Sequence, residues 1–205
     1  MIKRYLEKNG VDDLMNKDVV TIIFGDSIAY GLFDNEYCGW TNRIRIKLER
    51  KNNFVFNLAI PGQNSFDILN KFEQELINRY NKEDEFKIIF SFGIKDTLLI
   101  SQDNKIDYFR NNVLEIIKKT KEYTEDIYFI GLLKPDITIR KEYKLDNVIL
   151  IDNCLEEICK LQNVKYVRIR DIISNEYLSD GLHPNEEGHK KLANIIEEKI
   201  YKQEE

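Results

Sequence analysis

The sequence predicts a doubly wound α/β fold, a three-layer α/β/α sandwich around a five-stranded parallel sheet. Short apolar runs alternate with amphipathic segments along the chain, as in strands joined by crossover helices. The apolar runs are rich in β-branched residues and lack polar alternation, as expected of strands covered on both faces. The chain has 205 residues and no internal repeat, so we expect one domain over residues 1–205, with the motifs between about 19 and 200.

Five segments have the composition of buried strands. Three of them reach a glycine, Gly25, Gly93 or Gly131, where the chain can turn sharply. Because crossovers between parallel strands are right-handed, their order favours a doubly wound sheet. The predicted strands are Val19–Phe24, Asn53–Leu58, Lys87–Phe92, Asp126–Gly131 and Val164–Ile169.

Helices are expected between these strands. Ser65 is the predicted N-cap of the second helix, with Asp67 in its first turn. Asp146 and Asn185 are predicted to cap later helices, and the last of these has a regular apolar stripe. The expected helices are Trp40–Arg50, a segment that begins at Ser65, Asn112–Tyr123, Asp146–Leu161 and a final segment after Asn185.

The charge balance argues against nucleic acid or a membrane surface as the partner. The formal net charge is −5, whereas both partners require a basic face. No apolar run approaches the ~18 residues of a membrane-spanning helix. The first residues lack the apolar core of a secretory signal, so neither a membrane span nor export is expected.

The cysteines indicate a reducing compartment. Cys38, Cys154 and Cys159 are odd in number and lack the spacing of metal ligands, which is typical of reduced thiols in a cytoplasm. The chain has two histidines, His183 and His189, and neither forms a zinc-ligand pattern with a cysteine. We therefore expect a cytoplasmic protein without a metal or cofactor.

Four polar stretches that contain glycine or asparagine follow predicted strands. The carboxyl ends of parallel strands meet at one edge of the sheet, where doubly wound folds bind their ligands. We therefore expect the four stretches to converge there. They are Gly25–Ile28, Ala59–Asn64, Gly93–Asp96 and Asp180–Asn185.

Ser27, His183 and Asp180 have the chemistry of a hydrolytic triad. A serine hydroxyl becomes a good nucleophile when a base takes its proton, and histidine is suited to that role. A carboxylate then fixes the imidazole tautomer and stabilises its charged form. Asp180 and His183 are three residues apart in a glycine-containing turn, which allows such a contact.

Two other interpretations bear on this triad. Without the Asp-x-x-His pattern, Ser27 is equally well explained as a helix cap and His183 as a turn residue. The nucleophile elbow of α/β-hydrolases is excluded, because that motif requires glycine two residues after the serine. Here Ala29 occupies that position.

The two end blocks resemble those of the GDSL, or SGNH, hydrolase family. The first block is Phe24–Gly31, followed by Gly39 and Trp40, and the last block is Asp180–His189. The resemblance extends over residues 19 to about 200. It implies a flavodoxin-like sheet and hydrolysis of esters or thioesters without a metal.

The resemblance also implies roles for individual residues. The catalytic serine, acid and base of the family match Ser27, Asp180 and His183. Two of the family's oxyanion donors match the backbone N–H groups of Ser27 and Gly62. The third donor, an asparagine in the pattern Gly-x-Asn-Asp, is replaced here by Lys95.

Lys95 leaves three interpretations open. Its ammonium has three hydrogen-bond donors, so it can complete the oxyanion hole in place of the asparagine. It can instead bind an anionic part of the substrate. It can also point to solvent and leave a slower enzyme with two donors, because each donor is worth ~100- to 1000-fold in rate.

Other residues beside the motifs have weaker assignments. Tyr30, Trp40 and Asn64 are candidate substrate-binding residues, although aromatic side chains more often belong to the core. His189 is expected to make a structural hydrogen bond. Asp26 is expected to hold the turn before Ser27 through backbone hydrogen bonds.

These observations predict a serine esterase that acts on carboxylic esters or thioesters of small acylated substrates. One alternative is a catalytically weakened module of the same fold that binds an acylated sugar or lipid. Another is an acyltransferase that passes the acyl group to an alcohol. The substrate and the oligomeric state stay open, and Leu98–Asp107 and Leu132–Leu145 are either the rim of the site or surface loops.

Overall fold

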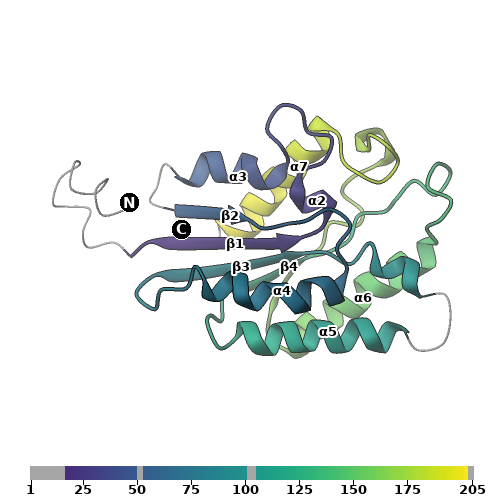
Figure 1. Cartoon of the computed structure of the whole chain (residues 1–205). Coiled ribbons are helices and arrows are strands. Elements are labelled where there is room, and N and C mark those ends of the chain that lie inside the picture. Colours follow the sequence, from purple (N-terminus) through teal and green to yellow (C-terminus); the bar gives the residue numbers. More distant parts are fainter. Residues whose placement is uncertain (1–16, 50–52, 101–104, 203–205) are drawn as a thin grey trace.

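A parallel sheet runs through the centre of the protein (Figure 1). The computed structural model describes residues 17–49, 53–100 and 105–202. The five-stranded sheet has the order β2-β1-β3-β4-β5, so the predicted α/β fold is confirmed and the order is flavodoxin-like. The strands are β1 (Val19–Gly25), β2 (Asn53–Asn57), β3 (Glu85–Ser91), β4 (Ile127–Ile130) and β5 (Lys165–Val167).

Helices cover both faces of this sheet and complete the three layers (Figure 1). One face carries α3 (Trp40–Leu48) and α7 (Glu186–Ile200), which contact each other. The other face carries α4 (Ser65–Ile77), α5 (Lys105–Thr120) and α6 (Leu145–Leu161). Three short elements lie in the connections: α2 (Ser27–Tyr30) and the 3-10 helices η3 (Asp96–Leu99) and η4 (Asn175–Tyr177).

Successive side chains of a strand pack alternately against the two helical layers. In β1, Ile22 packs with the α4–α5–α6 layer, whereas Ile23 packs with the α3–α7 layer. The same alternation in β3 divides Ile88 from Ile89. Both faces of these strands are therefore buried, which explains why their sequences are continuously apolar.

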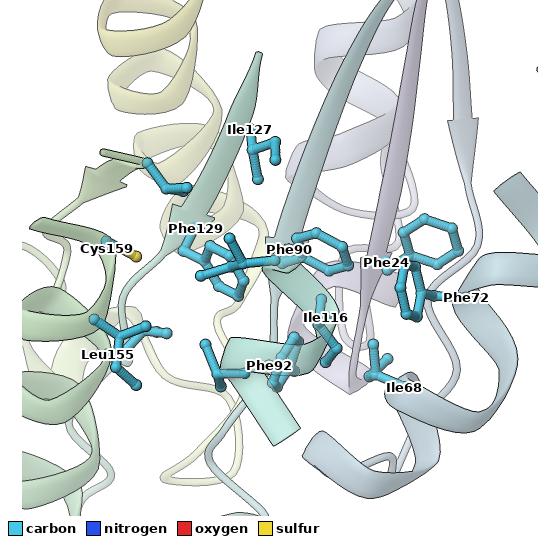
Figure 2. Packing of buried hydrophobic residues seen from close by; sticks show 14 of the residues in the cluster. Phe24, Ile68, Phe72, Phe90, Phe92, Ile116, Ile127, Phe129, Leu155 and Cys159 are labelled. Carbon is cyan, nitrogen blue, oxygen red and sulfur yellow. The ribbon is translucent and has the colours of Figure 1, made fainter. Parts of the chain in front are cut away.

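Phenylalanine rings pack against one another in the core between the sheet and the α4–α5–α6 layer (Figure 2). The rings of Phe90 and Phe129 stack with centroids 4.9 Å apart, and Phe24 stacks on Phe90 at 5.6 Å. Phe72 of α4 meets both Phe24 and Phe90 edge-on. This core supports β1 and β3, two of the strands that lead into polar stretches at the edge of the sheet.

Helix starts differ from the predictions. Asn64, not Ser65, caps α4, and it forms a capping box with Asp67. The N-cap of α6 is Lys144, which makes no side-chain cap, so Asp146 lies inside the first turn. The predicted end of α3 at residue 50 lies outside the described residues, and no described helix is long and apolar enough to cross a membrane.

Candidate active site

The turn after β1 brings Ser27 to the carboxyl edge of the sheet. Gly25 closes the strand, where an added Cβ would lie 2.4 Å from the backbone oxygen of Ser91, so only glycine fits. Asp26 then caps α2, and its Oδ1 accepts the N–H of Ile28 at 2.9 Å. The expected role of Asp26 in this turn is therefore confirmed.

Ser27, His183 and Asp180 form a continuous line of hydrogen bonds. The Oγ of Ser27 lies 2.9 Å from Nε2 of His183. Nδ1 of His183 lies 2.9 Å from Oδ2 of Asp180. The structure thus brings together side chains that are 156 residues apart in sequence, in the arrangement that activates a serine hydroxyl.

The carboxylate of Asp180 is anchored by its own turn. Its Oδ1 accepts the backbone N–H groups of Leu182 at 3.0 Å and of His183 at 2.8 Å. Burial raises the pKa of Asp180, but these hydrogen bonds and the one with the His183 ring outweigh it and leave the pKa below its usual value. The carboxyl group of Asp180 is therefore ionised at neutral pH.

Phe33 covers the imidazole and was missed by the sequence analysis. Its ring centroid lies 5.4 Å from that of His183, at an interplanar angle of 37°. The residue has a φ of +68°, in the left-handed region that side chains other than glycine rarely adopt. No sequence motif identifies Phe33, and the unusual φ that distinguishes it is visible only in the structure.

A buried network joins the loops that follow β2 and β3. Ser65 donates from Oγ to Oδ1 of Asp96 at 2.5 Å, and its backbone N–H donates to the same carboxylate. Asn112 donates from Nδ2 to the Oγ of Ser65 at 2.9 Å. Burial raises the pKa of Asp96 to about 6, although the hydrogen bonds from Ser65 oppose this shift. The network ties the stretches that hold Gly62 and Lys95 to each other.

The comparison with known protein families identifies the chain. A model of the GDSL-like lipase/acylhydrolase family matches residues 23–191, which include both end blocks of the site. The chain belongs to this family. A search of curated proteins finds no match.

Solved structures share the fold of this GDSL-like family member at low sequence identity. A lipolytic protein of the G-D-S-L family from Veillonella parvula is 17% identical, with a TM-score of 0.74 over 90% of this chain and 99% of that chain. A lipase/acylhydrolase from Enterococcus faecalis is 19% identical, with a TM-score of 0.73 over 90% of this chain and 96% of that chain. The acetylxylan esterase Axe2 from Geobacillus stearothermophilus is 16% identical, with a TM-score of 0.72 over 91% and 96%.

Two of the predicted oxyanion donors of this GDSL-like protein are backbone N–H groups, those of Ser27 after β1 and Gly62 after β2. Ser27 is the first residue of α2, so its N–H has no acceptor within the helix. The loop that holds Gly62 is fastened to the end of β1 by the N–H of Ile60, which donates to the oxygen of Gly25 at 3.0 Å. Among the described residues, the N–H of Gly62 meets no acceptor. Both groups are therefore available to a ligand.

Lys95 is exposed at the start of η3, directly before the buried Asp96. Within the described part of the chain its ammonium forms no ion pair and no hydrogen bond. Its neighbour Asp96 fixes the backbone at this point through Ser65. The backbone of Lys95 is therefore fixed, whereas its ammonium has no partner among the described residues. This arrangement is compatible with all three interpretations of Lys95.

The three candidate substrate-binding residues lie in different environments. Trp40 is only 1% exposed and packs with Ile44 in the core between the sheet and α7, so the prediction that it contacts substrate is wrong. Its position at the start of α3 turns it inward with the apolar face of that helix. Asn64 accepts the N–H groups of Phe66 and Asp67 as the cap of α4, which commits its Oδ1 to the helix.

Tyr30, the third candidate substrate-binding residue, lies on the surface of the protein. It is half exposed and lines a cavity of about 500 Å³ together with Phe33 and Asn57. Tyr30 is the last residue of α2, three residues after Ser27, and neither Ser27 nor His183 lines the cavity. This volume suits a small organic group.

His189 is a structural residue, as the sequence analysis predicted. Its ring is fully buried, with Nδ1 accepting the N–H of Trp40 at 3.3 Å and Nε2 donating to the oxygen of Leu32 at 3.0 Å. Burial lowers its pKa, so the ring is neutral and bridges two loops. It joins α7 to the segment that leads from α2 to α3.

Proposed function

We propose that this member of the GDSL-like family is a serine esterase that hydrolyses carboxylic esters or thioesters of small acylated substrates. The observation that carries the proposal is the hydrogen-bonded line from Ser27 through His183 to Asp180, with 2.9 Å at each side-chain contact. The family description supports an acylhydrolase, and no other histidine is available as the base, since His189 is enclosed.

Acylation begins at the hydroxyl of Ser27. Its Oγ forms a bond to the ester carbonyl carbon while its proton passes to Nε2 of His183. The carbonyl electron pair moves to oxygen, and the N–H groups of Ser27 and Gly62 hydrogen-bond the resulting oxyanion. Asp180, which hydrogen-bonds Nδ1, stabilises the positive charge on the imidazole.

Collapse of this intermediate releases the alcohol. The carbonyl re-forms, the bond to the leaving oxygen or sulfur breaks, and His183 donates its proton to the leaving group. Water then attacks the acyl-Ser27 carbonyl as His183 takes a proton from it. The acid departs, and the proton returns to the Oγ of Ser27.

Lys95 supplies the third oxyanion donor in this proposal. Its unpaired ammonium follows the end of β3, next to the end of β1 that presents Ser27. A cation at that position stabilises developing negative charge and needs no proton transfer. In this proposal the substrate is a short acyl ester, and its group beyond the carbonyl lies in the cavity beside Tyr30 and Phe33. The acetylxylan esterase among the structural neighbours acts on an ester of this kind, and we extend that class to this chain.

The test uses a short chromogenic ester, p-nitrophenyl acetate, and a fluorophosphonate probe. The wild-type protein is expected to release p-nitrophenol and to be labelled at Ser27. Ser27→Ala is expected to lose roughly 1,000-fold or more in kcat and to lose the label, whereas Ser174→Ala, at an exposed serine, retains both.

Three results would contradict this proposal. Hydrolysis by Ser27→Ala at the wild-type rate would remove Ser27 from the mechanism. A folded wild-type protein that is neither labelled nor active on any short ester would be a binding module. Labelling with product formation only when an alcohol acceptor is added would identify an acyltransferase.

A further inference from the structure

Asp180 has a second partner that no triad requires. Its Oδ2, the atom that lies 2.9 Å from Nδ1 of His183, also accepts a hydrogen bond from Nη1 of Arg140 at 2.9 Å. Arg140 lies 40 residues earlier in the chain, in the long connection between β4 and α6. One carboxylate oxygen therefore joins a permanent cation to the proposed base.

Backbone hydrogen bonds in the connection between β4 and α6 place Arg140 beside Asp180. The N–H of Arg140 donates to the oxygen of Asp136 at 2.8 Å, which closes a tight turn. The N–H of Asp136 in turn donates to the oxygen of Gly181 at 2.7 Å, so the turn is fastened to the residue that follows Asp180. The two loops meet side by side at the carboxyl edge of the sheet.

Gly181 permits this close packing. It has a φ of +81°, and an added Cβ would lie 3.0 Å from Cβ of Ile139 and 3.2 Å from Cγ of Arg140. A larger residue would be strained in its backbone and would push the Arg140 side chain away. The glycine of the last sequence block thus serves the contact between Arg140 and Asp180 as well as the turn itself.

Arg140 is held from the other side by its own loop. Its Nε donates to Glu142 at 2.8 Å, and its guanidinium lies 5.7 Å from the ring centroid of Tyr143. Burial lowers the pKa of Arg140, but the hydrogen bond with Glu142 and the charges of Glu142 and Asp180 outweigh it. The side chain is about three-quarters buried, so its position is restricted while solvent screens part of its charge.

We propose that Arg140 is a positioning residue that fixes the carboxylate of Asp180 toward His183 and, by its charge, offsets part of the negative charge that Asp180 places beside the imidazole. The inference rests on the proposed esterase mechanism, in which His183 must be neutral to accept the proton of Ser27. A cation beside Asp180 offsets part of the negative charge that favours a protonated ring. The other titratable and charged groups that act on Asp180 or His183 are Arg140, Glu142, Tyr143 and His189.

Two substitutions separate orientation from charge. Arg140→Gln removes the charge and the fork of donors, and is expected to lower kcat about tenfold with little change in KM. The acidic limb of its kcat/KM profile is expected to move upward by roughly 0.5 pH unit. Arg140→Lys keeps the charge without the fork, so its acidic limb should stay in place while kcat recovers in part.

Arg79→Gln is the matched control. Arg79 is 26% exposed against 25% for Arg140, and it pairs with Glu75 as Arg140 pairs with Glu142. It follows α4, away from the Ser27–His183–Asp180 line. This substitution is expected to change neither kcat nor the acidic limb.

An NMR titration, which needs no turnover, tests the role of Arg140 separately from the proposed esterase function. The chain has two histidines, so the imidazole signals in an NMR titration are assigned by their loss in His183→Gln. The His183 midpoint should rise in Arg140→Gln and stay near the wild-type value in Arg140→Lys and Arg79→Gln. An unchanged midpoint in Arg140→Gln would overturn the role of Arg140 even in an active enzyme.

The role of Arg140 can also stand while the proposed esterase function fails. A raised midpoint in Arg140→Gln, together with a wild-type protein that hydrolyses no ester, would reject the proposed function and leave the coupling of Arg140 to His183 standing. A fall in kcat and in thermal stability with an unmoved acidic limb and midpoint would make Arg140 a structural residue only, which overturns the inference.

Discussion

Ser65 and Asp96 hold two loops of the active site together through a buried hydrogen bond of 2.5 Å. Ser65 begins α4 directly after the Gly62 loop, and Asp96 begins η3 directly after Lys95. Neither side chain needs to touch the substrate for this contact to matter. It sets the distance between two proposed oxyanion donors, so its loss should affect both stability and catalysis.

Ser65→Ala is expected to lower the free energy of unfolding by about 1–3 kcal/mol. The substitution leaves the buried carboxylate of Asp96 and the amide of Asn112 without their shared partner. Urea unfolding followed by circular dichroism measures the change. Ser174→Ala, which removes an exposed hydroxyl bonded to Glu176, should cost less than ~0.5 kcal/mol. Equal costs for the two variants would show that the Ser65 network contributes nothing specific.

Asp26 is expected to make the protein less stable as the pH rises from about 4 to 7. Burial raises its pKa to about 7, against an ordinary value of 3.8. Between these values the folded state binds a proton that the unfolded state does not, so the stabilisation is complete at low pH and is lost as the pH rises through 7.

The substitution Asp26→Asn removes this titration, and its amide oxygen can still accept the N–H of Ile28. Relative to wild type, the variant should gain on the order of 3 kcal/mol between pH 4 and 7, at most. Urea unfolding of both proteins across this pH range provides the measurement. A difference that stays constant with pH would mean that Asp26 is ionised throughout.

Lys95→Ala is expected to lower kcat by about 10- to 100-fold with KM nearly unchanged, because an oxyanion donor acts in the transition state. Lys95→Asn, which restores the residue of the family pattern, should retain most of the activity. Steady-state kinetics on p-nitrophenyl acetate and on an ester with a negatively charged acyl group test both variants. An unaltered kcat in Lys95→Ala would place the side chain in solvent. A rise in KM confined to the anionic ester would make it a substrate-binding residue.

Lys87 is expected to contribute more stability than its neighbour Lys165, although both contact Asp126. The Lys87 side chain is 3% exposed, lies 2.9 Å from Asp126 and sits over the rings of Tyr128 and Tyr201. Lys87→Met should therefore lower the free energy of unfolding by about 2 kcal/mol. Lys165→Met, at a half-exposed side chain, should cost less than ~1 kcal/mol. Thermal and urea unfolding compare the two, and a larger cost for Lys165 would contradict this account.

The local order of structure could be predicted well from the chain alone. Buried strands such as β1 and β3 are continuously apolar because both faces are covered, and this composition is visible without coordinates. Asn185 was predicted as the cap of α7 and is observed there, with its side chain accepting the N–H of Gly188. Strand composition and the Asn185 cap depend on residues close in sequence, so they could be predicted from the chain, whereas the caps predicted at Ser65 and Asp146 were wrong.

Side-chain environments were harder to predict. Trp40 lies beside a motif, yet it turns into the core because the apolar face of α3 packs on the sheet and α7. Ser65 has the chemistry of a helix cap, but Asn64 takes that role and leaves Ser65 to bind Asp96. In each case a contact with an element distant in sequence decides which role the side chain takes.

The sequence by itself determined the alternation of strands and helices, the family blocks, and the choice of Ser27, His183 and Asp180 as the residues with triad chemistry. Only the tertiary structure decided that Arg140 reaches Asp180 and that Phe33 covers His183. The physical reason is the range of the interactions. Propensity, caps and hydrophobic periodicity act within one element, whereas these contacts arise where separate loops pack together at the edge of the sheet, and no local pattern encodes that meeting.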